Sequence, residues 1–457
     1  MKKPRPPVVT VLGHVDHGKT TLLDYIRKSS VAKKEAGGIT QTIGASVIKT
    51  DGKEITFIDT PGHAAFSQMR ARGARLADLV VLVVAADDGV KPQTIEALKY
   101  MMEVNSPFVV AFTKVDLPSA DVEKAKGELE KLGVLFEGRG GNTPFVAVSA
   151  KAGTGVGDLL ETIVLMAQVI GISGDLDANL EAFVIETQRG KSGVLVSVIV
   201  KNGKVKVADT VYCGTLAAKV RGLFDFQGKS IKESFPGYPC QILGFSALAG
   251  VGSKISDQPS FVVEQKIAVD EYGGGGLPVV LKASNSGSLE AVSASIPEGV
   301  NIVAKSVGNV TQSDVFLAKN SNANIYAFES KANSDVKRLS ETEGVKIFEF
   351  KIIYELFDAL TKIIEEGVEK ILGKAQVLAS FPYEKRKVAG CKMIEGMINR
   401  SSKLKLVRGE DSVGSVKPIS LKKGKSDVNE VRQGEEFGII FEPQLEFKSG
   451  DVLLSVQ

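Results

Sequence analysis

Apolar runs and amphipathic stretches alternate along the first 170 residues. Continuous apolar runs are typical of parallel strands covered on both faces, and they occur at residues 7–12, 55–58, 79–86, 108–112 and 145–148. Between them, residues 92–103 and 122–132 have helical periodicity. Because strands that alternate with helices build a parallel sheet, the pattern predicts an α/β domain over residues 1–171.

The pattern changes after residue 171. Residues 171–180 have no periodicity and are interpreted as a linker. Short strand-like segments separated by glycine follow, at 182–187, 193–200, 210–213, 217–223 and 240–245. This spacing predicts a small β-barrel, which we place at residues 180–265.

Residues 273–276 are all glycine and mark a further break. Strand-like segments at 279–283, 302–307, 325–328 and 346–350 then alternate with helical patterns, which predicts a second, smaller α/β domain over 277–351. The small polar residues at 284–288 and 311–314 suit either phosphate cradles or helix caps. The capping-box form of Thr311 to Asp314 favours capping.

Apolar residues between 352 and 372 recur at helical spacing, with charged residues between them. A helix of about twenty residues spans roughly 30 Å. We therefore expect a linker helix over 352–372, followed by a last segment, 373–457, whose strands and turns predict a C-terminal β-barrel.

A phosphate-binding loop follows the first strand. The pattern G-x-x-x-x-G-K-[ST] surrounds phosphates with backbone N–H groups and with the positive end of the next helix. Lys19 supplies a point charge, and the Thr20 hydroxyl can reach Mg²⁺. The loop comprises Gly13, His14, Val15, Asp16, His17, Gly18, Lys19 and Thr20.

Polar signatures follow three more of the strands, at the edge where an open parallel sheet binds its ligand. They specify guanine, because the Asp116 carboxylate can accept two hydrogen bonds from that base, whereas adenine would leave a buried acceptor unpaired. The Lys114 stem can cover the base, and the Ala150 N–H can meet the guanine carbonyl. The signatures are Asp59, Thr60, Pro61, Gly62 and His63, then Thr113, Lys114, Val115 and Asp116, then Ser149, Ala150 and Lys151.

The same residues predict a magnesium-dependent switch. Asp59 is placed to hold Mg²⁺ through water, with Thr20 as a direct ligand, and the Gly62 N–H can meet the γ-phosphate. Thr40, in the loop between Val31 and Ala45, could give Mg²⁺ a second hydroxyl only when the γ-phosphate is present. The first domain is thus predicted to be a P-loop GTPase domain with GTP or GDP and Mg²⁺ as cofactors.

The loop G-H-V-D-H-G-K-T together with D-T-P-G-H resembles the GTPases of translation. The resemblance implies that His63 positions the attacking water, and that the apolar residues Val15 and Ile39 hold it away until the ribosome repositions it. The alternative is that His63 is a helix cap or a solvated side chain. Thr113 departs from the Asn of most members and shortens a side chain that ties the phosphate loop to the base site. This predicts a lower nucleotide affinity, with the choice of guanine retained through Asp116.

Length and composition limit the number of domains and the cellular location that we expect for the protein. The 457 residues suit three or four domains, and 43% hydrophobic with 24% charged residues is an ordinary balance. The three cysteines show neither metal-ligand spacing nor a disulfide framework. No signal peptide and no apolar stretch of membrane-spanning length is recognisable. We expect a cytoplasmic monomer with no membrane partner.

Basic residues concentrate in the last segment. Residues 373–457 contain fifteen Lys and Arg against eleven Asp and Glu, a net charge of +4, whereas the whole chain carries +3. The clusters lie at 385–387, 400–408 and 422–425. Each suits a solvated face, and together they suggest an RNA backbone as partner.

The order of GTPase domain, barrel, small α/β domain, long helix and barrel resembles the family of bacterial translation initiation factor 2 over the whole chain, in a short form without a long N-terminal extension. The resemblance implies GTP-dependent binding of formylmethionyl initiator tRNA to the small ribosomal subunit, promotion of large-subunit joining, and ribosome-stimulated hydrolysis. Both ribosomal subunits would then be partners. The tRNA site would include Cys391, Lys422, Lys423, Glu436, Phe437 and Gly438.

Some residues depart from that family's pattern. Lys423 and Gly424 follow Lys422 where members usually carry Arg and an aromatic, and Phe437 stands where they have Cys. A Phe would fill the space that receives the methionine side chain, which leaves the mode of formyl recognition open. Arg70, Arg72 and Arg75 are expected either to contact the ribosome or to form a solvated helix face.

Two other functions stay open. One is another tRNA-handling translational GTPase of elongation type, which usually lacks a small α/β domain and a long helix before its last barrel. The other is a regulatory GTPase outside translation. Ribosome-stimulated hydrolysis and co-purifying RNA distinguish the translational functions from the regulatory one.

Overall fold

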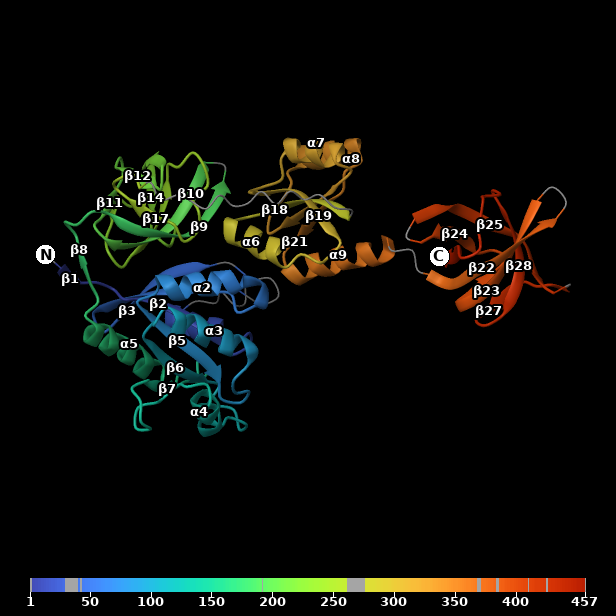
Figure 1. Ribbon diagram of the computed structural model, residues 1–457. Coiled ribbons are helices and arrows are strands. Elements are labelled where there is room, and N and C mark those ends of the chain that lie inside the picture. Colours follow the sequence, from blue (N-terminus) through green and yellow to red (C-terminus); the bar gives the residue numbers. More distant parts are fainter. Residues whose placement is uncertain are drawn as a thin grey trace. The chain divides into compact units, whose positions relative to one another are not determined.

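The computed structural model describes residues 2–28, 40–41, 43–190, 192–260, 276–367, 371–383, 386–409, 411–424 and 426–456. The chain divides into two compact units, Met1–Leu360 and Thr361–Gln457. Figure 1 shows the elements of both along the sequence. The observed fold is a GTPase-type α/β domain, a barrel, a small α/β domain and a second barrel, as predicted.

The first domain is built on a six-stranded sheet of order β3-β4-β2-β5-β6-β7, in which all strands but β3 run parallel. The strands are β2 (Val8–Gly13), β3 (Gly44–Thr50), β4 (Lys53–Asp59), β5 (Leu79–Ala85), β6 (Phe108–Thr113) and β7 (Phe145–Ala147). The helices are α1 (Lys19–Arg27), α2 (Ser67–Leu76), α3 (Pro92–Glu103), α4 (Val122–Glu130) and α5 (Val156–Ile170).

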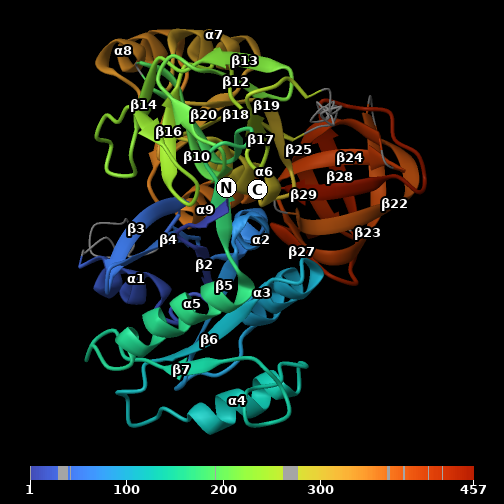
Figure 2. The same ribbon diagram turned by 90° about the vertical axis from the view of Figure 1, so that its left-hand side faces the viewer.

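Both faces of this sheet are covered, which explains its continuous apolar strands. In β5, Leu79, Val81 and Val83 pack with residues of α1 and α5, whereas Val80, Leu82 and Val84 pack with residues of α2, α3 and α4. Figure 2 shows helices on the two sides of the sheet. The predicted strands and helices of this domain are confirmed to within a few residues at their ends.

The second domain is a seven-stranded antiparallel sheet of order β13-β12-β17-β9-β10-β16-β14 around one apolar core. Its strands are β9 (Glu181–Gly190), β10 (Gly193–Asn202), β12 (Thr210–Cys213), β13 (Leu216–Lys219), β14 (Gly222–Phe224), β16 (Pro239–Leu243) and β17 (Lys254–Ser256), with the pair β11 (Val205–Lys206) and β15 (Glu233–Ser234) beside them. The single strand expected at 217–223 is two strands, β13 and β14.

The expected linker at 171–180 contains a short strand. Strand β8 (Ser173–Asp175) pairs antiparallel with β1 (Lys2–Pro4). The start of the chain is thereby fixed next to the connection between the GTPase domain and the barrel. Three residues are too few for apolar periodicity to reveal a strand, so the sequence pattern missed both partners.

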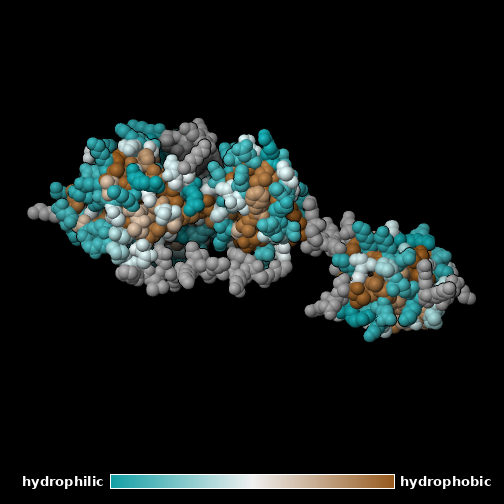
Figure 3. Space-filling model, turned by 90° about the horizontal axis from the view of Figure 1, so that it is seen from above, coloured by the Kyte–Doolittle hydropathy of each residue, from teal (hydrophilic) through white to brown (hydrophobic). Residues whose placement is uncertain are grey.

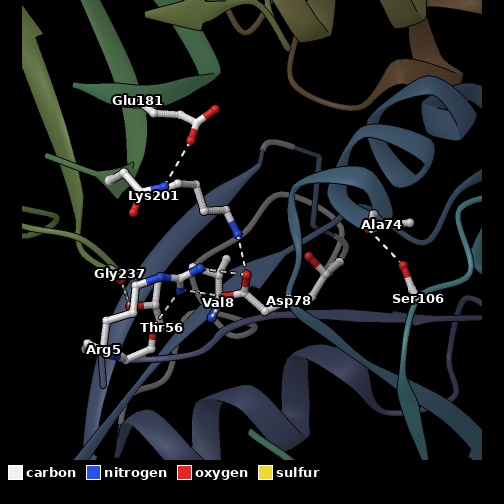
Figure 4. Close-up of polar contacts among 12 residues, drawn as sticks. Arg5, Val8, Thr56, Ala74, Asp78, Ser106, Glu181, Lys201 and Gly237 are labelled. Carbon is white, nitrogen blue, oxygen red and sulfur yellow. Dashed lines mark hydrogen bonds and ion pairs between the residues drawn. The ribbon is translucent and has the colours of Figure 1, made fainter. Parts of the chain in front are cut away.

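Partly buried ions join the GTPase domain to the first barrel (Figure 4). Arg5 makes a bidentate pair with Asp78, at 2.6 and 2.8 Å, and Lys201 of β10 contacts the same carboxylate at 2.8 Å. The Val8 N–H donates to Asp78 at 2.8 Å, and the Thr56 hydroxyl donates to the Gly237 carbonyl across the interface. Asp78 thus has charged or N–H partners from two segments of the chain, residues 5–8 and strand β10.

The small α/β domain has a parallel sheet of order β19-β18-β20-β21. Its elements are β18 (Leu277–Ala283), α6 (Ser286–Ala294), β19 (Val300–Val307), α7 (Gln312–Asn320), β20 (Asn324–Phe328), α8 (Ser334–Glu343) and β21 (Ile347–Phe350). Asn285 caps α6, and Thr311 forms a capping box with Asp314 on α7. The capping interpretation of both polar segments is confirmed.

The linker helix is shorter than the expected 352–372. Helix α9 spans Ile353–Gly367, and strand β22 already begins at Ile371. Fifteen residues span roughly 22 Å rather than 30 Å. Leu356 and Leu360 of α9 are buried within the first unit, together with Ile353.

The second unit is a closed antiparallel barrel, because β22 pairs with its neighbour β29 and also with β23, which closes the order β22-β29-β24-β25-β28-β23 into a ring. Its strands are longer than the sequence pattern indicated: β22 (Ile371–Tyr383), β23 (Arg386–Asn399), β24 (Lys403–Arg408), β25 (Asp411–Lys423), β28 (Glu436–Glu442) and β29 (Val452–Val456), with β26 (Ser426–Asp427) and β27 (Glu430–Arg432) at the edges. Inward side chains of these strands form one apolar core.

Figure 3 shows hydrophilic side chains interspersed with hydrophobic patches on one face of the chain. Within the described ranges, no helix combines the length and the apolar character needed to cross a membrane.

Candidate functional site

One cavity of about 410 Å³ brings the predicted sequence signatures together. It lies at the carboxyl end of the GTPase-domain strands, where the loops after β2, β4, β6 and β7 meet. Of the residues proposed from sequence, those lining it are Val15, Asp16, Gly18, Lys19, Thr20, Thr40, Gly62, His63, Thr113, Lys114, Asp116, Ala150 and Lys151. Those that do not line it are Gly13, His14, His17, Asp59, Thr60, Pro61, Val115 and Ser149.

The phosphate loop needs glycine at two positions. Gly18 has φ +86° and begins α1, and Gly13 has φ +150°. A Cβ atom on Gly13 would lie 2.3 Å from the Val83 carbonyl oxygen, so no larger residue fits beside β5. The loop can therefore turn tightly from β2 into α1, which directs backbone N–H groups toward the cavity.

Lys19 is buried at the base of this loop. Its ammonium group donates to the Gly13 carbonyl at 2.9 Å and to the His14 carbonyl. Burial lowers the pKa of Lys19 to about 8, although Asp59 and Asp16 oppose that shift. A Cβ on Gly62 would lie 2.5 Å from the Lys19 nitrogen, so glycine at 62 lets the second signature approach the lysine closely.

Oxygen groups suited to Mg²⁺ gather beside Lys19. The Thr20 and Thr40 hydroxyl oxygens are 3.0 Å apart. Asp59 is 3% exposed and lies 3.6 Å from Arg27, and its Oδ1 has no hydrogen-bond partner among the described residues. Burial raises the pKa of Asp59 to about 6, with Arg27 and Lys19 opposing. Two hydroxyls and a carboxylate oxygen without a hydrogen-bond partner are the oxygen donors that this cation prefers.

The base side of the cavity is organised by Ser149. Its hydroxyl donates to Asp116 at 2.7 Å and accepts from the Ala152 N–H at 3.0 Å. The bond from Ser149 holds the pKa of Asp116 below its usual value. Lys114, in a left-handed conformation at φ +59°, contacts Asp87 at 3.7 Å. The Asp116 carboxylate is therefore ionised and oriented as a hydrogen-bond acceptor.

Thr113 still ties the phosphate loop to the base site. Its hydroxyl donates to the His17 carbonyl at 2.5 Å, and both groups are buried. The shorter side chain of threonine thus still reaches the phosphate loop. The lower nucleotide affinity expected from the replacement of Asn stays a prediction.

The phosphate-loop histidines add no positive charge near neutral pH. Burial, followed by the neighbouring His14, lowers the pKa of His17 to about 4. The two rings meet edge to face at 5.1 Å, and His17 lies 3.5 Å from Asp88. Lys19 is therefore the nearby cation of the loop for a phosphate.

His63 is a helix cap in this conformation. Its Nδ1 accepts the Ala65 N–H at 3.1 Å at the start of the short 3-10 helix Ala64–Phe66. Burial, and then Arg70, hold the pKa of His63 below its usual value. The ring is thus neutral at pH 7 and carries its proton on Nε2. The capping alternative for this residue matches the geometry, and the ring also lines the cavity.

Arg70 is fully buried, which corrects the expectation of a surface contact for it. Its guanidinium donates to the carbonyls of Pro61 and His63 and pairs with Glu96 at 2.7 Å. Arg72 is paired with Glu290 of α6 at 2.6 Å, and Arg75 is exposed. The three arginines look equivalent in the sequence, but helical geometry turns them in three directions.

Tyr354 lines the cavity and was not expected there. It comes from the first turn of α9, and its ring meets the His63 ring edge to face at 4.3 Å. Thr21 and Leu117 also line the cavity. Tyr354 is 42% exposed, and no local sequence pattern around it indicated a place in this cavity.

The residues proposed for tRNA fall into two groups. Cys391 and Phe437 are register partners in β23 and β28, and their side chains are buried in the barrel core at 1% and 4% exposure. Their side chains are therefore not open to RNA in this conformation. Lys422, Lys423, Glu436 and Gly438 are at least partly exposed, and Lys423 pairs with Glu435 at 2.5 Å. Lys425 lies outside the described residues.

Comparison with protein families matches three segments. Residues 5–169 match the elongation factor Tu GTP binding domain, residues 179–258 match elongation factor G domain 2, and residues 262–361 match translation-initiation factor 2.

Curated relatives match over nearly the whole chain. Translation initiation factor IF-2 of Caldanaerobacter subterraneus subsp. tengcongensis is 41% identical, with 99% of this chain and 69% of the relative covered. Translation initiation factor IF-2 of Thermotoga sp. (strain RQ2) is 42% identical, with 98% and 71% covered. Among solved structures, GDP-bound aIF5B from Aeropyrum pernix aligns with a TM-score of 0.46 at 25% identity, over 100% of this chain and 92% of that one.

Proposed function

This chain belongs to the translation initiation factor IF-2 family and is a GTPase, and from that premise we propose how its residues serve initiation. The proposed activity is GTP-dependent binding of formylmethionyl initiator tRNA to the small ribosomal subunit, promotion of large-subunit joining, and GTP hydrolysis stimulated by the ribosome. These partners would place the protein in the cytoplasm. The convergence of four sequence signatures on one cavity supports this most strongly.

Nucleotide binding follows from the cavity's donors and acceptors. Lys19 exchanges its two backbone carbonyl partners for phosphate oxygens, which restores a full positive charge to a group whose pKa burial has lowered. The Gly62 N–H is placed to meet the γ-phosphate. Asp116, held by Ser149, accepts from the guanine edge, and the Ala150 N–H donates to its carbonyl.

The magnesium site is proposed at Thr20, Thr40 and Asp59. When bound, Mg²⁺ would neutralise charge on the β- and γ-phosphate oxygens. Thr40 reaches this site from the switch loop, so its hydroxyl can contribute only when the loop is closed over the phosphates. Asp59 supplies the buried carboxylate, and Arg27 partly balances its charge.

Hydrolysis requires His63 to leave its capping position. With Nδ1 bound to the Ala65 N–H, only Nε2–H faces outward, and it can donate to a water but cannot accept a proton from it. Once it has left the cap, the ring can orient the attacking water, which is the role that the resemblance to the translational GTPases implies for it.

The exposed basic residues of the C-terminal barrel are proposed to contact the tRNA backbone. Lys422 and Lys423 end β25, where Lys422 lies in register with Gly438 of β28. Glu436, two residues before Gly438 in the same strand, lies in register with Lys392 of β23. Burial of Cys391 and Phe437 assigns those two a structural role in the barrel wall.

Sedimentation with small ribosomal subunits, with GTP or GDP and with or without initiator tRNA, tests the proposal. We expect co-sedimentation of the tRNA with the subunit to depend on this protein and on GTP. Binding of elongator aminoacyl-tRNA instead would favour the elongation-type alternative. No interaction with ribosomes and no stimulated hydrolysis would favour a regulatory GTPase outside translation.

A further inference from the structure

The first turn of helix α9 contacts both parts of the nucleotide switch. Gln41, one residue after Thr40, is 4% exposed, and its amide nitrogen donates to the Lys351 carbonyl at 2.7 Å. Its amide oxygen accepts the Ile353 N–H at 3.1 Å. Gln41 therefore supplies a hydrogen-bond acceptor for an N–H at the start of α9.

Tyr354 follows directly and reaches the other part of the switch. Its ring lies against His63 with a centroid distance of 4.3 Å and an interplanar angle of 87°. This edge-to-face geometry is the favourable one for two aromatic rings. Phe66 meets the same imidazole at 6.2 Å and 80°.

His63 is thus held from three sides. The Ala65 N–H binds its Nδ1, Phe66 packs against its ring from the same turn, and Tyr354 packs against it from a helix that lies 290 residues later in the chain. Rotation of the imidazole out of the capping position must break both the Nδ1 bond and the Tyr354 contact.

We propose that Tyr354 is a positioning residue that holds His63 in its capping conformation and so keeps GTP hydrolysis slow until α9 moves. The inference rests on the proposed role of His63 in hydrolysis. Gln41 extends the idea, because it follows Thr40, whose hydroxyl lies 3.0 Å from that of Thr20, and it binds the first turn of the helix that carries Tyr354.

The ring, rather than the hydroxyl, carries this effect. Tyr354 is 42% exposed, and the described contact with His63 is between rings. Tyr354→Ala removes the ring contact, whereas Tyr354→Phe retains it. An exposed neighbour on the same turn, Glu355, provides a matched control for changes in the helix.

The test is single-turnover GTP hydrolysis by the full chain without ribosomes. For Tyr354→Ala we expect a rise of roughly two- to tenfold, the range that an edge-to-face aromatic pair contributes. Tyr354→Phe should restore the slow rate, and Glu355→Ala should leave it unchanged. The maximal rate with ribosomes should be the same for all of them, so that the ratio of stimulated to basal rate falls only for Tyr354→Ala.

A double mutant separates this inference from the proposed function. In a His63→Ala background, Tyr354→Ala should give no further rise. An unchanged basal rate in Tyr354→Ala, or a rise that persists without His63, would overturn the inference while leaving the role of His63 intact. If His63→Ala itself keeps full ribosome-stimulated hydrolysis, the proposed role of His63 fails first. Thermal unfolding and GDP affinity of each variant confirm that it is folded.

Discussion

The Thr113 hydroxyl donates a buried hydrogen bond to the carbonyl of His17 and so connects the end of β6 to the phosphate loop. The same hydroxyl oxygen lies 3.9 Å from the position of a Cβ on Gly18, the residue that begins α1. One buried hydrogen bond therefore connects the base site to the phosphate site.

Thr113→Val tests this contact. Valine has nearly the shape of threonine but cannot donate, which leaves the His17 carbonyl without this partner. We expect the affinity for GDP to fall by about fivefold, since a lost hydrogen bond to a buried acceptor costs on the order of 1 kcal/mol or more. Thr113→Ser keeps the donor and should bind as the wild type does. Equal affinity of the valine and serine variants in a fluorescent-nucleotide titration would contradict the role.

Asp116→Asn tests the choice of base. The amide presents a donor where guanine requires an acceptor, but it complements the extra carbonyl of xanthine. We expect weaker binding of GTP and a gain for xanthosine triphosphate. A competition assay between GTP and xanthosine triphosphate measures this change of preference. Ser149→Ala is the companion variant, because it removes the hydroxyl that orients Asp116 at 2.7 Å without altering the base-reading group. It should lower affinity for both nucleotides without reversing preference.

Asp78→Asn tests the partly buried junction between the GTPase domain and the first barrel. The substitution leaves Arg5 and Lys201 facing a neutral amide. For a partly buried pair, the expected cost lies between the roughly 1 kcal/mol of an exposed pair and the roughly 3 kcal/mol of a buried one. Chemical denaturation at pH 7 should show this loss. Asp257→Asn, an exposed position of the barrel segment, is the control and should change little.

The effect of Asp78 should depend on pH with a definite sign. Burial alone would raise the pKa of Asp78, but the bonds from Arg5 and Lys201 outweigh it and hold the pKa below its usual value. A carboxyl with a depressed folded-state pKa stabilises the fold fully above the unfolded value near 4 and loses that contribution as pH falls through the folded pKa. The difference between wild type and Asp78→Asn should therefore shrink below about pH 4. A difference that stays constant down to pH 3 would contradict the ionic origin.

Lys422→Ala and Lys423→Ala test the proposed tRNA contact. We expect the two substitutions to reduce the salt dependence of tRNA binding by different amounts. Lys423 is already paired with Glu435 at 2.5 Å, whereas no ion pair of Lys422 is found among the described residues. Each lysine that neutralises a phosphate contributes roughly one unit to the salt dependence of binding. Filter binding of initiator tRNA at several salt concentrations should show a full unit lost for Lys422→Ala and less for Lys423→Ala. GTP affinity should not change in either. If the slope of tRNA affinity against salt concentration is equal for wild type and both variants, these lysines do not contact tRNA phosphates and form only a solvated surface.

Short sequence signatures at strand ends were enough to predict most of the nucleotide cavity. Gly18, Lys19, Asp116 and Ala150 lie far apart in the sequence, yet parallel strands bring their carboxyl ends to one edge of a sheet. Tyr354 could not be found in this way, because it reaches the cavity by the docking of another domain. Tertiary packing of that kind leaves no local pattern around the residue.

The errors in the helix and barrel have a related origin. Ile371 fits the helical spacing of α9, but it also begins the alternating pattern of β22, whose Ala375 and Val377 face the barrel core. Where the helical period and the alternating strand period overlap for only a few residues, the sequence alone does not show where the helix ends and the strand begins. Phe437 was interpreted as filling a ligand space, yet its register position opposite Cys391 directs it into the core. Phe437→Cys would therefore open a cavity in the barrel before it altered any recognition of RNA.

The ion pair between Arg72 of α2 and Glu290 of α6 connects the GTPase domain to the small α/β domain, so it can link nucleotide affinity to the affinity for a partner of the small domain. Helix α2 follows directly after the turn that contains Gly62, and Arg70 fixes the carbonyls on both sides of that glycine. If the pair between the two helices forms in one nucleotide state and not in the other, a partner that holds the small α/β domain must change the ratio of GTP to GDP affinity. By thermodynamic linkage, replacement of GDP by GTP must then change the affinity of the protein for that partner by the same factor.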